Sequence, residues 1–583
     1  MTGDIGQSAL SGLASDSVAL PQGCSRRKQN LEKEFGVNKP QKPLDPGFSP
    51  TLPNLLAHAA QAFPDRTFLI DASGEQTFAQ VEADSAELAR GLLALGVGKA
   101  SRVALFVPNT PEWVLCWLAA GRIGALTQPF STLYKPAELD WGLTHLDTET
   151  LFVQARYGNI DLVARLEEAI PGLADQTDTT LFLPSHPYLR RIIVMDECDR
   201  PWAIKGAAAL REAAAAYPQI DNAYLARVEQ LVTPADLLVT ISTSGTTAHP
   251  KAVVHTHGTA IRITHEFLDY IDFIPEDRNL VGMPMFWVGG LNTNLLPALH
   301  IGASLVFAAG PKTSDVLDAI TRFRVTRLPW WPIQIQALLK EAAEAGADLS
   351  SMERVLTTRD DHGRVIPPER RGYSFGMTET FGMHTIERRT VAMPASKAGA
   401  MGRNLPHIER RIVDPETGVE VPPGQQGELQ VRGYTLMAGY YKVEREDVFT
   451  EDGFYPTGDI CSIDRDGWLY FHTRRTEMIK TSGANVAPME VERVLITHPQ
   501  VSETYVFGMA HPTKGEAVVA VVVPEKGETI DTAALRKLTA DQLSAYKVPQ
   551  AIFSIEEQDI PRTASGKVNK NNLAKLVADK VDW

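Results

Sequence analysis

Cysteine is scarce in this sequence. Only four of its 583 residues are cysteines, at positions 24, 116, 198 and 461. They are scattered and form no Cys-x-x-Cys pair, which argues against a small disulfide-stapled scaffold and is typical of a reducing compartment. We therefore expect a cytoplasmic protein.

Long hydrophobic runs are also missing. No segment has the ~18 uninterrupted apolar residues of a membrane-spanning helix, and the most apolar stretch, residues 517–523, has the length of a strand. The N-terminus carries Asp4 and no basic start followed by an apolar core, so no signal peptide is expected. Residues 1–50 are predicted to be a solvated N-terminal extension, with contact of Arg26–Lys28 to an anionic membrane surface as the alternative.

Positive charge is in deficit. The chain has 57 Lys and Arg against 71 Asp and Glu, a net charge of −14. A broadly basic surface for nucleic acid is therefore not expected. With 44% hydrophobic and 22% charged residues the composition is that of a globular protein, and 583 residues exceed what one core usually holds, so at least two domains are expected.

Strand-like and helix-like segments alternate from about residue 50 onward. This rhythm predicts an α/β fold with parallel sheets covered by helices. We expect a large N-terminal domain over 51–474, with a small β-barrel subdomain, and a small α+β domain over 475–583. The predicted helices are 52–62, 112–123, 488–498 and 531–543, and the predicted strands are 67–70, 102–107, 125–129, 236–241, 280–283, 304–307, 467–471, 501–509 and 516–523.

The most informative segment follows the apolar run 236–241. It consists of Thr243, Ser244, Gly245, Thr246, Thr247, Ala248, His249, Pro250 and Lys251. Backbone N–H groups and hydroxyls in such a turn can surround phosphate oxygens, and glycine lets the backbone approach closely. The spacing is not that of the common P-loop, which points to a different ATP chemistry. Taken alone, the segment could equally be a surface Ser/Thr turn.

Further segments carry groups suited to a nucleotide. Phe375, Gly376, Thr378 and Glu379 place a ring, a glycine, a hydroxyl and a carboxylate close together; the ring can stack on a base and the carboxylate can hold Mg²⁺. The turn Tyr455–Asp459 offers a carboxylate for ribose hydroxyls, and Arg474 offers a guanidinium for phosphate or sugar oxygens. Ile560–Lys567 is a second turn with glycine and lysine.

In this order the segments resemble the acyl-adenylate-forming superfamily, which includes acyl-CoA synthetases, peptide-synthetase adenylation domains and luciferases. The resemblance covers roughly residues 50–583 and implies an AMP-binding adenylation domain followed by a mobile C-terminal domain. Five weak matches in the expected order make coincidence very improbable.

The resemblance also implies roles for single residues. Lys567, Thr378 and Glu379 would be catalytic, Glu379 as the Mg²⁺ ligand. The nucleotide would be held by Thr243, Ser244, Gly245, Thr246, Thr247, Lys251, Phe375, Gly376, Asp459 and Arg474. The C-terminal domain would rotate about Thr476 between the two half-reactions, after which residues 481–485 would line a tunnel for the thiol.

The implied reaction is ATP-dependent conversion of a carboxylic acid to acyl-AMP and then to a CoA thioester, with loss of AMP and pyrophosphate. ATP, Mg²⁺ and CoA are the implied cofactors and co-substrates, and fatty acid metabolism is one implied setting. The alternatives are an acyl-AMP ligase that loads a carrier protein and a non-catalytic nucleotide-binding homologue. A homodimer is an open alternative to a monomer.

The sequence departs from the family pattern at several positions. Ala248 and Ala252 replace glycines usual in the phosphate loop, and Thr473 and Thr476 replace the usual residues on either side of the arginine pair. The usual adenine loop is hard to find in the shortened stretch 357–374. We expect this shortening to widen the acid pocket, which implies a bulky or long acid.

Some aromatic and histidine residues have a simpler interpretation than a site. For His249, His255 and His257 a zinc site is disfavoured, because no cysteine or carboxylate pair completes a ligand set. Trp330 is predicted to pack in the core, whereas core and pocket are equally favoured for Trp287. The acid pocket is expected to form from residues 286–290, 330–336 and 376–384.

Overall fold

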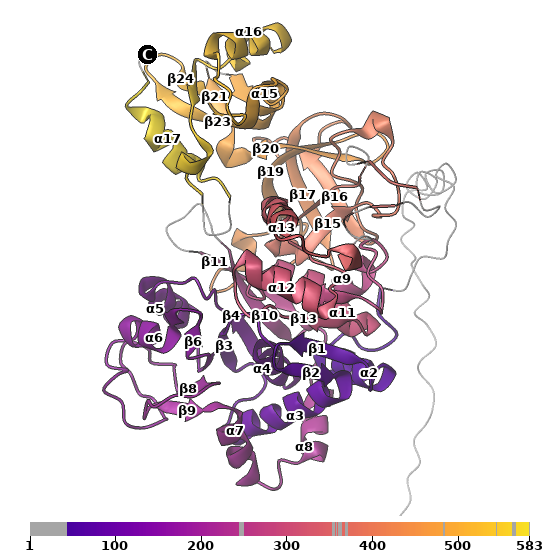
Figure 1. The fold of residues 1–583 in the computed structure, drawn as a ribbon, viewed down its shortest axis with the longest axis vertical. Helices are drawn as coiled ribbons and strands as arrows, with labels where there is room; N and C mark the ends of the chain where they lie inside the picture. The colour runs from indigo at the N-terminus through magenta and orange to yellow at the C-terminus, as the bar shows by residue number, and fades with distance from the viewer. Residues whose placement is uncertain are drawn as a thin grey trace, which may run out of the picture. The chain divides into compact units, whose positions relative to one another are not determined.

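The computed structural model describes most of the chain from residue 44 onward (Figure 1). The described residues are 44–243, 250–330, 332–352, 356, 358–359, 364–367, 371–481, 484–543, 545–562, 567–581 and 583, without the side chains of 332, 333, 484 and 485. Most of the predicted N-terminal extension and the centre of the predicted phosphate loop, residues 244–249, therefore lie outside the description.

An eight-stranded sheet forms the first layer of the large domain. Its order is β18 (Gly439–Tyr440), β11 (Lys251–Thr256), β10 (Leu237–Thr243), β4 (Leu126–Pro129), β3 (Arg102–Phe106), β5 (Thr150–Val153), β8 (Arg191–Val194) and β9 (Ala203–Lys205). The pairs from β10 to β9 are parallel, as predicted, whereas β11 and β18 join antiparallel at one edge.

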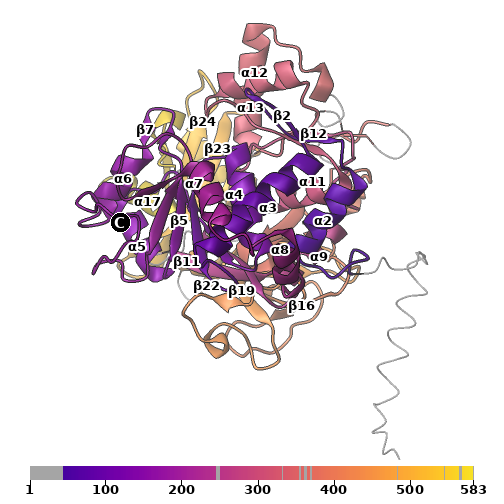
Figure 2. The ribbon, with the colours of Figure 1, turned by 90° about the horizontal axis from the view of Figure 1, so that it is seen from below.

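Helices cover both faces of this sheet because successive strand residues point to opposite sides. Val103 and Leu105 of β3 pack with Trp113 and Trp117 in the same core as α3 (Phe78–Ala94) and α4 (Pro111–Arg122). Ala104 and Phe106 face the other way, toward α5 (Pro136–His145) and α6 (Leu162–Ala169). Figure 2 shows the two helical layers on either side of β5. This is the predicted helix-covered α/β architecture.

A second, smaller sheet has the order β12 (Arg278–Leu280), β13 (Ser304–Val306), β1 (Thr67–Asp71) and β2 (Gly74–Thr77). Ile70 and Val306 face the cluster shared with α12 (Thr313–Phe323) and α13 (Pro332–Ala345), while residues on the opposite face share a core with α2 (Leu52–Ala62), α9 (His257–Phe267) and α11 (Leu296–Ile301). The predicted strand 280–283 is wrong by about two residues: the Gly282 amide bonds back to the carbonyl of Leu280, so the chain turns there.

The third sheet is antiparallel, with the order β16 (Ile408–Val413), β17 (Gly427–Gly433), β19 (Tyr455–Ile463) and β20 (Leu469–Arg474). It is the predicted small β-subdomain, although its strand pairs among the described residues form an open order and no closed barrel. The predicted strand 467–471 begins and ends too early. Gly467 lies in a turn with positive φ, and the strand continues through the polar residues 472–474 because it pairs with β19.

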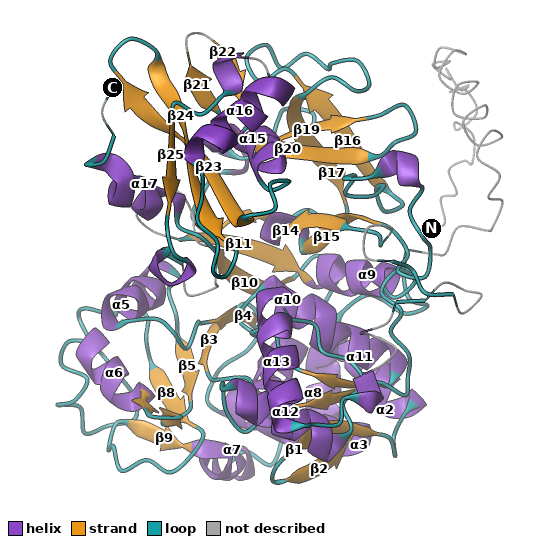
Figure 3. Cartoon of the chain, turned by 45° about the horizontal axis from the view of Figure 1, so that its top comes forward, coloured by secondary structure: helices purple, strands orange, loops and turns teal. Residues whose placement is uncertain are grey.

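The small C-terminal domain has five strands in α+β arrangement: β22 (Ala484–Val486), β21 (Ile479–Thr481), β24 (Gly515–Pro524) and β23 (Val501–His511), with β25 (Ala551–Ser554) parallel to β24. Alternate residues of β24 pack with α15 (Pro488–Leu495) and α16 (Thr532–Gln542) in one cluster and with α17 (Lys570–Ala578) in another. Figure 3 shows these helices around the sheet. The predicted helix 488–498 is shorter, since its backbone is capped at Ile496.

The large domain also contains two smaller helices, α7 (Gly206–Ala215) and α8 (Asn222–Gln230), and a hairpin of β6 (Arg156–Tyr157) and β7 (Ile160–Asp161). Within the described part of the chain, every helix is too short or too polar to traverse a bilayer.

Candidate active site

The strands on either side of the predicted phosphate loop form an antiparallel hairpin. β10 ends at Thr243 and β11 begins at Lys251, and the two residues lie opposite each other. The Thr243 hydroxyl donates to the Lys251 carbonyl at 3.3 Å, which closes the base of the loop. Ser244, Gly245, Thr246 and Thr247 fall outside the described residues, so their predicted contacts with phosphate stay predictions.

The short strand β18 brings Tyr440 beside the base of this loop. β18 pairs with β11, with Tyr440 opposite Val253. The ammonium of Lys251 lies 4.8 Å from the centre of the Tyr440 ring, and the Tyr440 hydroxyl donates to Glu379 Oε1 at 2.8 Å. Two predicted site residues, Lys251 and Glu379, are thus brought to one tyrosine.

Thr378 and Glu379 lie in a one-turn 3-10 helix (Thr378–Thr380) between β14 (Ser374–Met377) and β15 (Gly382–Ile386). The hairpin is tight at Gly376, where a Cβ atom would lie 2.1 Å from the Gly382 carbonyl oxygen. Phe381 takes a left-handed conformation with φ of 51°, which turns the chain into β15. Glycine at 376 is therefore required by packing, whatever it does for a nucleotide.

A buried histidine holds the backbone of this turn. His255 Nε2 lies 2.7 Å from the Thr378 carbonyl oxygen, and because a carbonyl only accepts, Nε2 carries the proton. Burial lowers the pKa of His255 to about 4, so the ring is neutral at physiological pH. His257 likewise acts in the core, where its Nδ1 accepts from the Leu52 amide at 3.1 Å.

Phe375 lies between two other rings. Its ring is edge-on to His384, with centroids 5.6 Å apart, and tilted against Phe471 at 5.3 Å. The half-buried ring is thus packed against two aromatic side chains. Its predicted contact with adenine stays a prediction.

Asp459 and Arg474 meet across two neighbouring strands. They lie opposite each other in the β19–β20 pairing, with Arg474 Nε 2.8 Å from Asp459 Oδ1. Asp459 is fully buried whereas Arg474 is 45% exposed. Neither Asp459 oxygen has an aligned hydrogen-bond donor among the described residues, and burial raises the pKa of Asp459 to about 6.

A buried carboxylate whose oxygens accept no aligned hydrogen bond is costly unless a ligand supplies the donors. Two ribose hydroxyls are donors of that kind, so Asp459 fits its predicted role. Arg474 also donates through Nη1 to the Thr457 carbonyl at 3.0 Å, which holds its guanidinium beside the carboxylate.

Glu379 offers one half-buried carboxylate, and its predicted role as a ligand of Mg²⁺ stays a prediction. Among the described residues no group of three or more His, Cys, Asp or Glu side chains could hold a metal. Mg²⁺ commonly uses one or two carboxylates together with substrate phosphates and water. Glu379 would be the protein ligand, and phosphate oxygens would complete the shell.

The predicted acid pocket begins at an irregular helix. Val288–Gly290 continues into a π-helix, Leu291–Leu295, a feature frequent at functional sites. Buried Asn292 donates to the Phe381 carbonyl at 2.9 Å, which joins this helix to the turn that carries Glu379. Trp287 lies edge-on to buried Phe286 at 5.1 Å, and half-buried Trp330 packs against the α12–α13 core as predicted.

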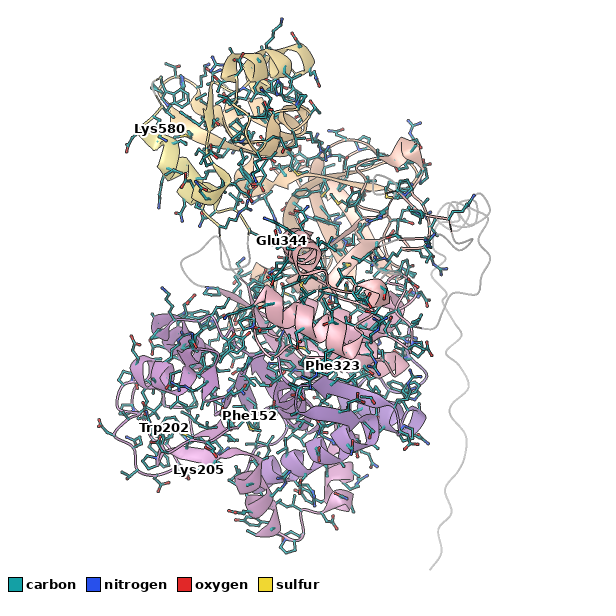
Figure 4. The ribbon with its side chains drawn as sticks, in the orientation of Figure 1. Phe152, Trp202, Lys205, Phe323, Glu344 and Lys580 are labelled. Atoms are coloured by element: carbon teal, nitrogen blue, oxygen red, sulfur yellow. The ribbon has the colours of Figure 1, made fainter. Side chains whose placement is uncertain are left out.

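An open cavity of about 980 Å³ lies in another part of the large domain. Arg156, Cys198 and Lys205 are among its lining residues, and Figure 4 marks Trp202 and Lys205 in that region. None of the predicted site residues lines it.

The C-terminal residues are placed only in part. Lys567 has an exposed side chain, and residues 563–566 before it lie outside the description. Thr476 is the middle residue of a one-turn 3-10 helix, Arg475–Glu477, immediately after β20. The catalytic role of Lys567 and the pivot at Thr476 stay predictions.

Three residues that organise the candidate site carry no sequence signal for that role: Tyr440, His255, which holds the Thr378 backbone, and Tyr455, which contacts Tyr440. Tyr455 shares a hydrogen bond of 2.9 Å with the Tyr440 hydroxyl. The contacts of these residues depend on pairing between segments that are distant in sequence, so no local sequence pattern predicts them.

Comparison with known proteins gives the same assignment over most of the chain. Residues 56–441 match the AMP-binding enzyme family, and residues 490–567 match the AMP-binding enzyme C-terminal domain. An indoleacetate–CoA ligase from Aromatoleum aromaticum is 32% identical, covering 89% of this chain and 96% of its own length. A 4-coumarate–CoA ligase from Humulus lupulus, CCL1, is 30% identical, with 89% and 92% covered.

Solved structures agree on the fold. ATP-bound MatB from Rhodopseudomonas palustris superposes with a TM-score of 0.67 at 26% identity, covering 91% of this chain and all of that one. A fatty acyl CoA synthetase from Mycobacterium tuberculosis gives 0.64 at 25% identity. With the helix-covered sheets, the small C-terminal domain and these matches together, the chain belongs to the AMP-binding enzyme family.

Proposed function

We propose that this protein is an AMP-forming acid–CoA ligase: it activates a carboxylic acid with ATP and passes the acyl group to CoA. The observation that carries the proposal is the buried Asp459 carboxylate, which forms an ion pair with Arg474 but accepts no aligned hydrogen bond from the described residues. Such a group suits the hydroxyls of a nucleoside. The named activities of the indoleacetate and 4-coumarate relatives support the same reaction.

In the first half-reaction a carboxylate oxygen of the acid attacks the α-phosphorus of ATP. A phosphorus–oxygen bond forms, the bond to the β-phosphate bridge breaks, and pyrophosphate leaves. Charge grows on the α-phosphate oxygens, where Thr378 and Lys567 would donate and Lys251 would offset charge on the departing pyrophosphate. Mg²⁺ bound with ATP would neutralise phosphate charge beside Glu379.

In the second half-reaction the sulfur of CoA attacks the acyl carbon. The carbon–sulfur bond forms, the thiol proton passes to solvent, and AMP leaves with the oxygen it shared with the acyl group. Residues 481–485 would line the approach of the thiol after the C-terminal domain has rotated.

We further propose a bulky or long acid as substrate. The shortened stretch 357–374 gave this expectation, and two relatives are named for aromatic acids. We also propose that the protein acts in fatty acid metabolism, is located in the cytoplasm and forms a homodimer. Cell fractionation tests the location, and light scattering of the purified protein tests the dimer.

The function is tested by acid-dependent release of pyrophosphate from ATP across acetate, long-chain, aryl-substituted and polycyclic acids. We expect release with a bulky or long acid, and an acyl-CoA product when CoA is added. Transfer to a carrier protein but not to CoA would identify the alternative ligase. A protein that binds ATP and releases no pyrophosphate with any acid would be a non-catalytic homologue, and a preference for acetate would overturn the bulky-acid proposal.

A further inference from the structure

One side chain touches two of the groups to which the proposed function assigns ATP contacts. Tyr440 stands on the two-residue strand β18, paired with β11, whose first residue is Lys251. Its ring lies under the Lys251 ammonium at 4.8 Å, and its hydroxyl reaches Glu379 Oε1 at 2.8 Å. The ring and the hydroxyl thus face different partners.

The hydrogen bonds around the Tyr440 hydroxyl have a fixed direction. The Tyr440 hydroxyl has one proton, and it donates this proton in the hydrogen bond to Glu379. The Tyr455 hydroxyl, 2.9 Å away, must then be the donor to Tyr440. The result is an ordered chain from Tyr455 through Tyr440 to Glu379, in which each bond polarises the next.

The chain starts on the strand that also carries Asp459. Tyr455 is the first residue of β19 and is buried, whereas Tyr440 and Glu379 are half-buried. The main chain at Glu379 is held as well, because its carbonyl accepts from the Met437 amide at 2.8 Å. The carboxylate is therefore fixed from both its backbone and one side-chain oxygen.

Lys251 adds an electrostatic link to the same ring. An ammonium over an aromatic face gains attraction from the ring quadrupole, and the contact limits where the flexible side chain can go. Among the described residues, no carboxylate lies within ion-pair distance of the Lys251 ammonium. Tyr440 thus holds the lysine near the loop without neutralising its charge.

We propose that Tyr440 is a positioning residue that sets Glu379 and Lys251 in register for a metal–triphosphate, so that binding of the metal and the phosphates is coupled. This inference rests on the proposed function and concerns how the nucleotide is held. Tyr440 itself has no contact with the reacting atoms in this account. The coupling predicts a defect specific to the metal-bound form of ATP.

The test is calorimetric titration of the purified full-length protein with ATP, once in excess Mg²⁺ and once in excess EDTA. Tyr440→Phe keeps the ring under Lys251 and removes the hydrogen bond to Glu379. We expect its Kd for ATP in Mg²⁺ to rise about tenfold, the range of a hydrogen bond to a charged group, while its Kd in EDTA stays at the wild-type value. Replacing Mg²⁺ by Mn²⁺ should show the same difference.

Tyr441→Phe is the matched control. Tyr441 is the next residue and donates to a different carboxylate, Asp147 Oδ2, at 3.1 Å. This variant should bind ATP as the wild type does in both buffers. Tyr455→Phe, which removes only the outer donor, should give a smaller defect of the same kind and also serves if Tyr440→Phe fails to fold.

The contact between the Lys251 ammonium and the Tyr440 ring is tested by a double-mutant cycle of Lys251→Met and Tyr440→Leu. We expect the combined loss of affinity in Mg²⁺ to be smaller than the product of the single losses, since each change breaks the same contact. Wild-type affinity of Tyr440→Phe in Mg²⁺, equal losses in Mg²⁺ and EDTA, or multiplicative losses in the cycle would overturn the proposal. All of these experiments measure ATP binding and none measures turnover. The ligase proposal is tested by a different measurement, acid-dependent pyrophosphate release, so the failure of one proposal can be told from the failure of the other.

Discussion

At the residue scale, Asp459 is the group whose environment is most at odds with its charge. It is fully buried, its oxygens lack aligned donors, and its pKa is raised from 3.8 to about 6. Because the folded-state pKa lies above the unfolded one, the ionised carboxylate destabilises the fold as pH rises from about 4 to about 6, and the penalty is constant above that range.

Asp459→Asn should therefore stabilise the unliganded protein at pH 8, on the order of 2 kcal/mol, and leave it near wild type at pH 4. The same variant should lose most of its ATP affinity. The amide has one neutral acceptor oxygen in place of two charged ones, so it cannot accept hydrogen bonds from both ribose hydroxyls. Thermal unfolding across this pH range and calorimetric ATP titration measure the two effects. A variant less stable than wild type at pH 8 would show that Asp459 serves the fold.

Lys567 gives the second prediction at this scale. Lys567→Ala should slow acyl-AMP formation by ~10²–10³, the usual effect of losing one charge stabiliser in a transition state, and should leave thioester formation from supplied acyl-AMP near wild type. Single-turnover assays of the two half-reactions separate these effects. Lys580→Ala, an exposed lysine of the same terminal region shown in Figure 4, is the control. Equal losses in both half-reactions, or no loss, would refute the role.

At the scale of elements, the β14–β15 hairpin depends on one glycine. A methyl group on Gly376 would lie 2.1 Å from the Gly382 carbonyl oxygen and 2.4 Å from the Met383 Cα. These are backbone atoms, so the hairpin must open to admit it. Gly376→Ala should lower stability by about 1–3 kcal/mol and weaken ATP binding by displacing Glu379.

Gly98→Ala is the matched control, because a Cβ there would meet nothing within 4 Å. Denaturant unfolding and ATP titration of both variants give the comparison. If Gly376→Ala unfolds at the same denaturant concentration as Gly98→Ala, the hairpin does not have the tight packing described.

The elements also show where sequence patterns are informative. The helix Leu52–Ala62 has the predicted bounds, since Thr51 caps it and Pro53 lies in its first turn. The sequence pattern predicts strand β20 too early, because the apolar residues end at Phe471. Pairing with β19 continues the strand to Arg474. That pairing sets Arg474 opposite Asp459, so the local pattern could not reveal this part of the site.

The sequence motifs single out the charged candidates for the site, whose roles stay predictions, but not the residues that contact them. Glu379, Asp459 and Lys251 stood out because their motifs follow a known order. Tyr440 and His255 did not, because their partners lie 61 and 123 residues away in sequence. Burial and strand pairing decide these contacts, and both arise only when the chain folds.

At the scale of the whole molecule, the fold class and the division into a large and a small domain are confirmed, because alternation of strands and helices over long spans is a strong signal. The proposed rotation about Thr476 is a further prediction. Thr476→Pro would fix φ and restrict Arg475, so thioester formation should slow far more than acyl-AMP formation. Thr476→Ala is the control. Similar rates of thioester formation in the two variants would show that Thr476 is not the pivot.

The most direct test of the central claim is pyrophosphate release by the wild-type protein with ATP and Mg²⁺, measured with and without each acid and followed by addition of CoA. We expect release that depends on a bulky or long acid, stoichiometric AMP, and an acyl-CoA product once CoA is present. ATP binding without acid-dependent pyrophosphate release from any acid would contradict it.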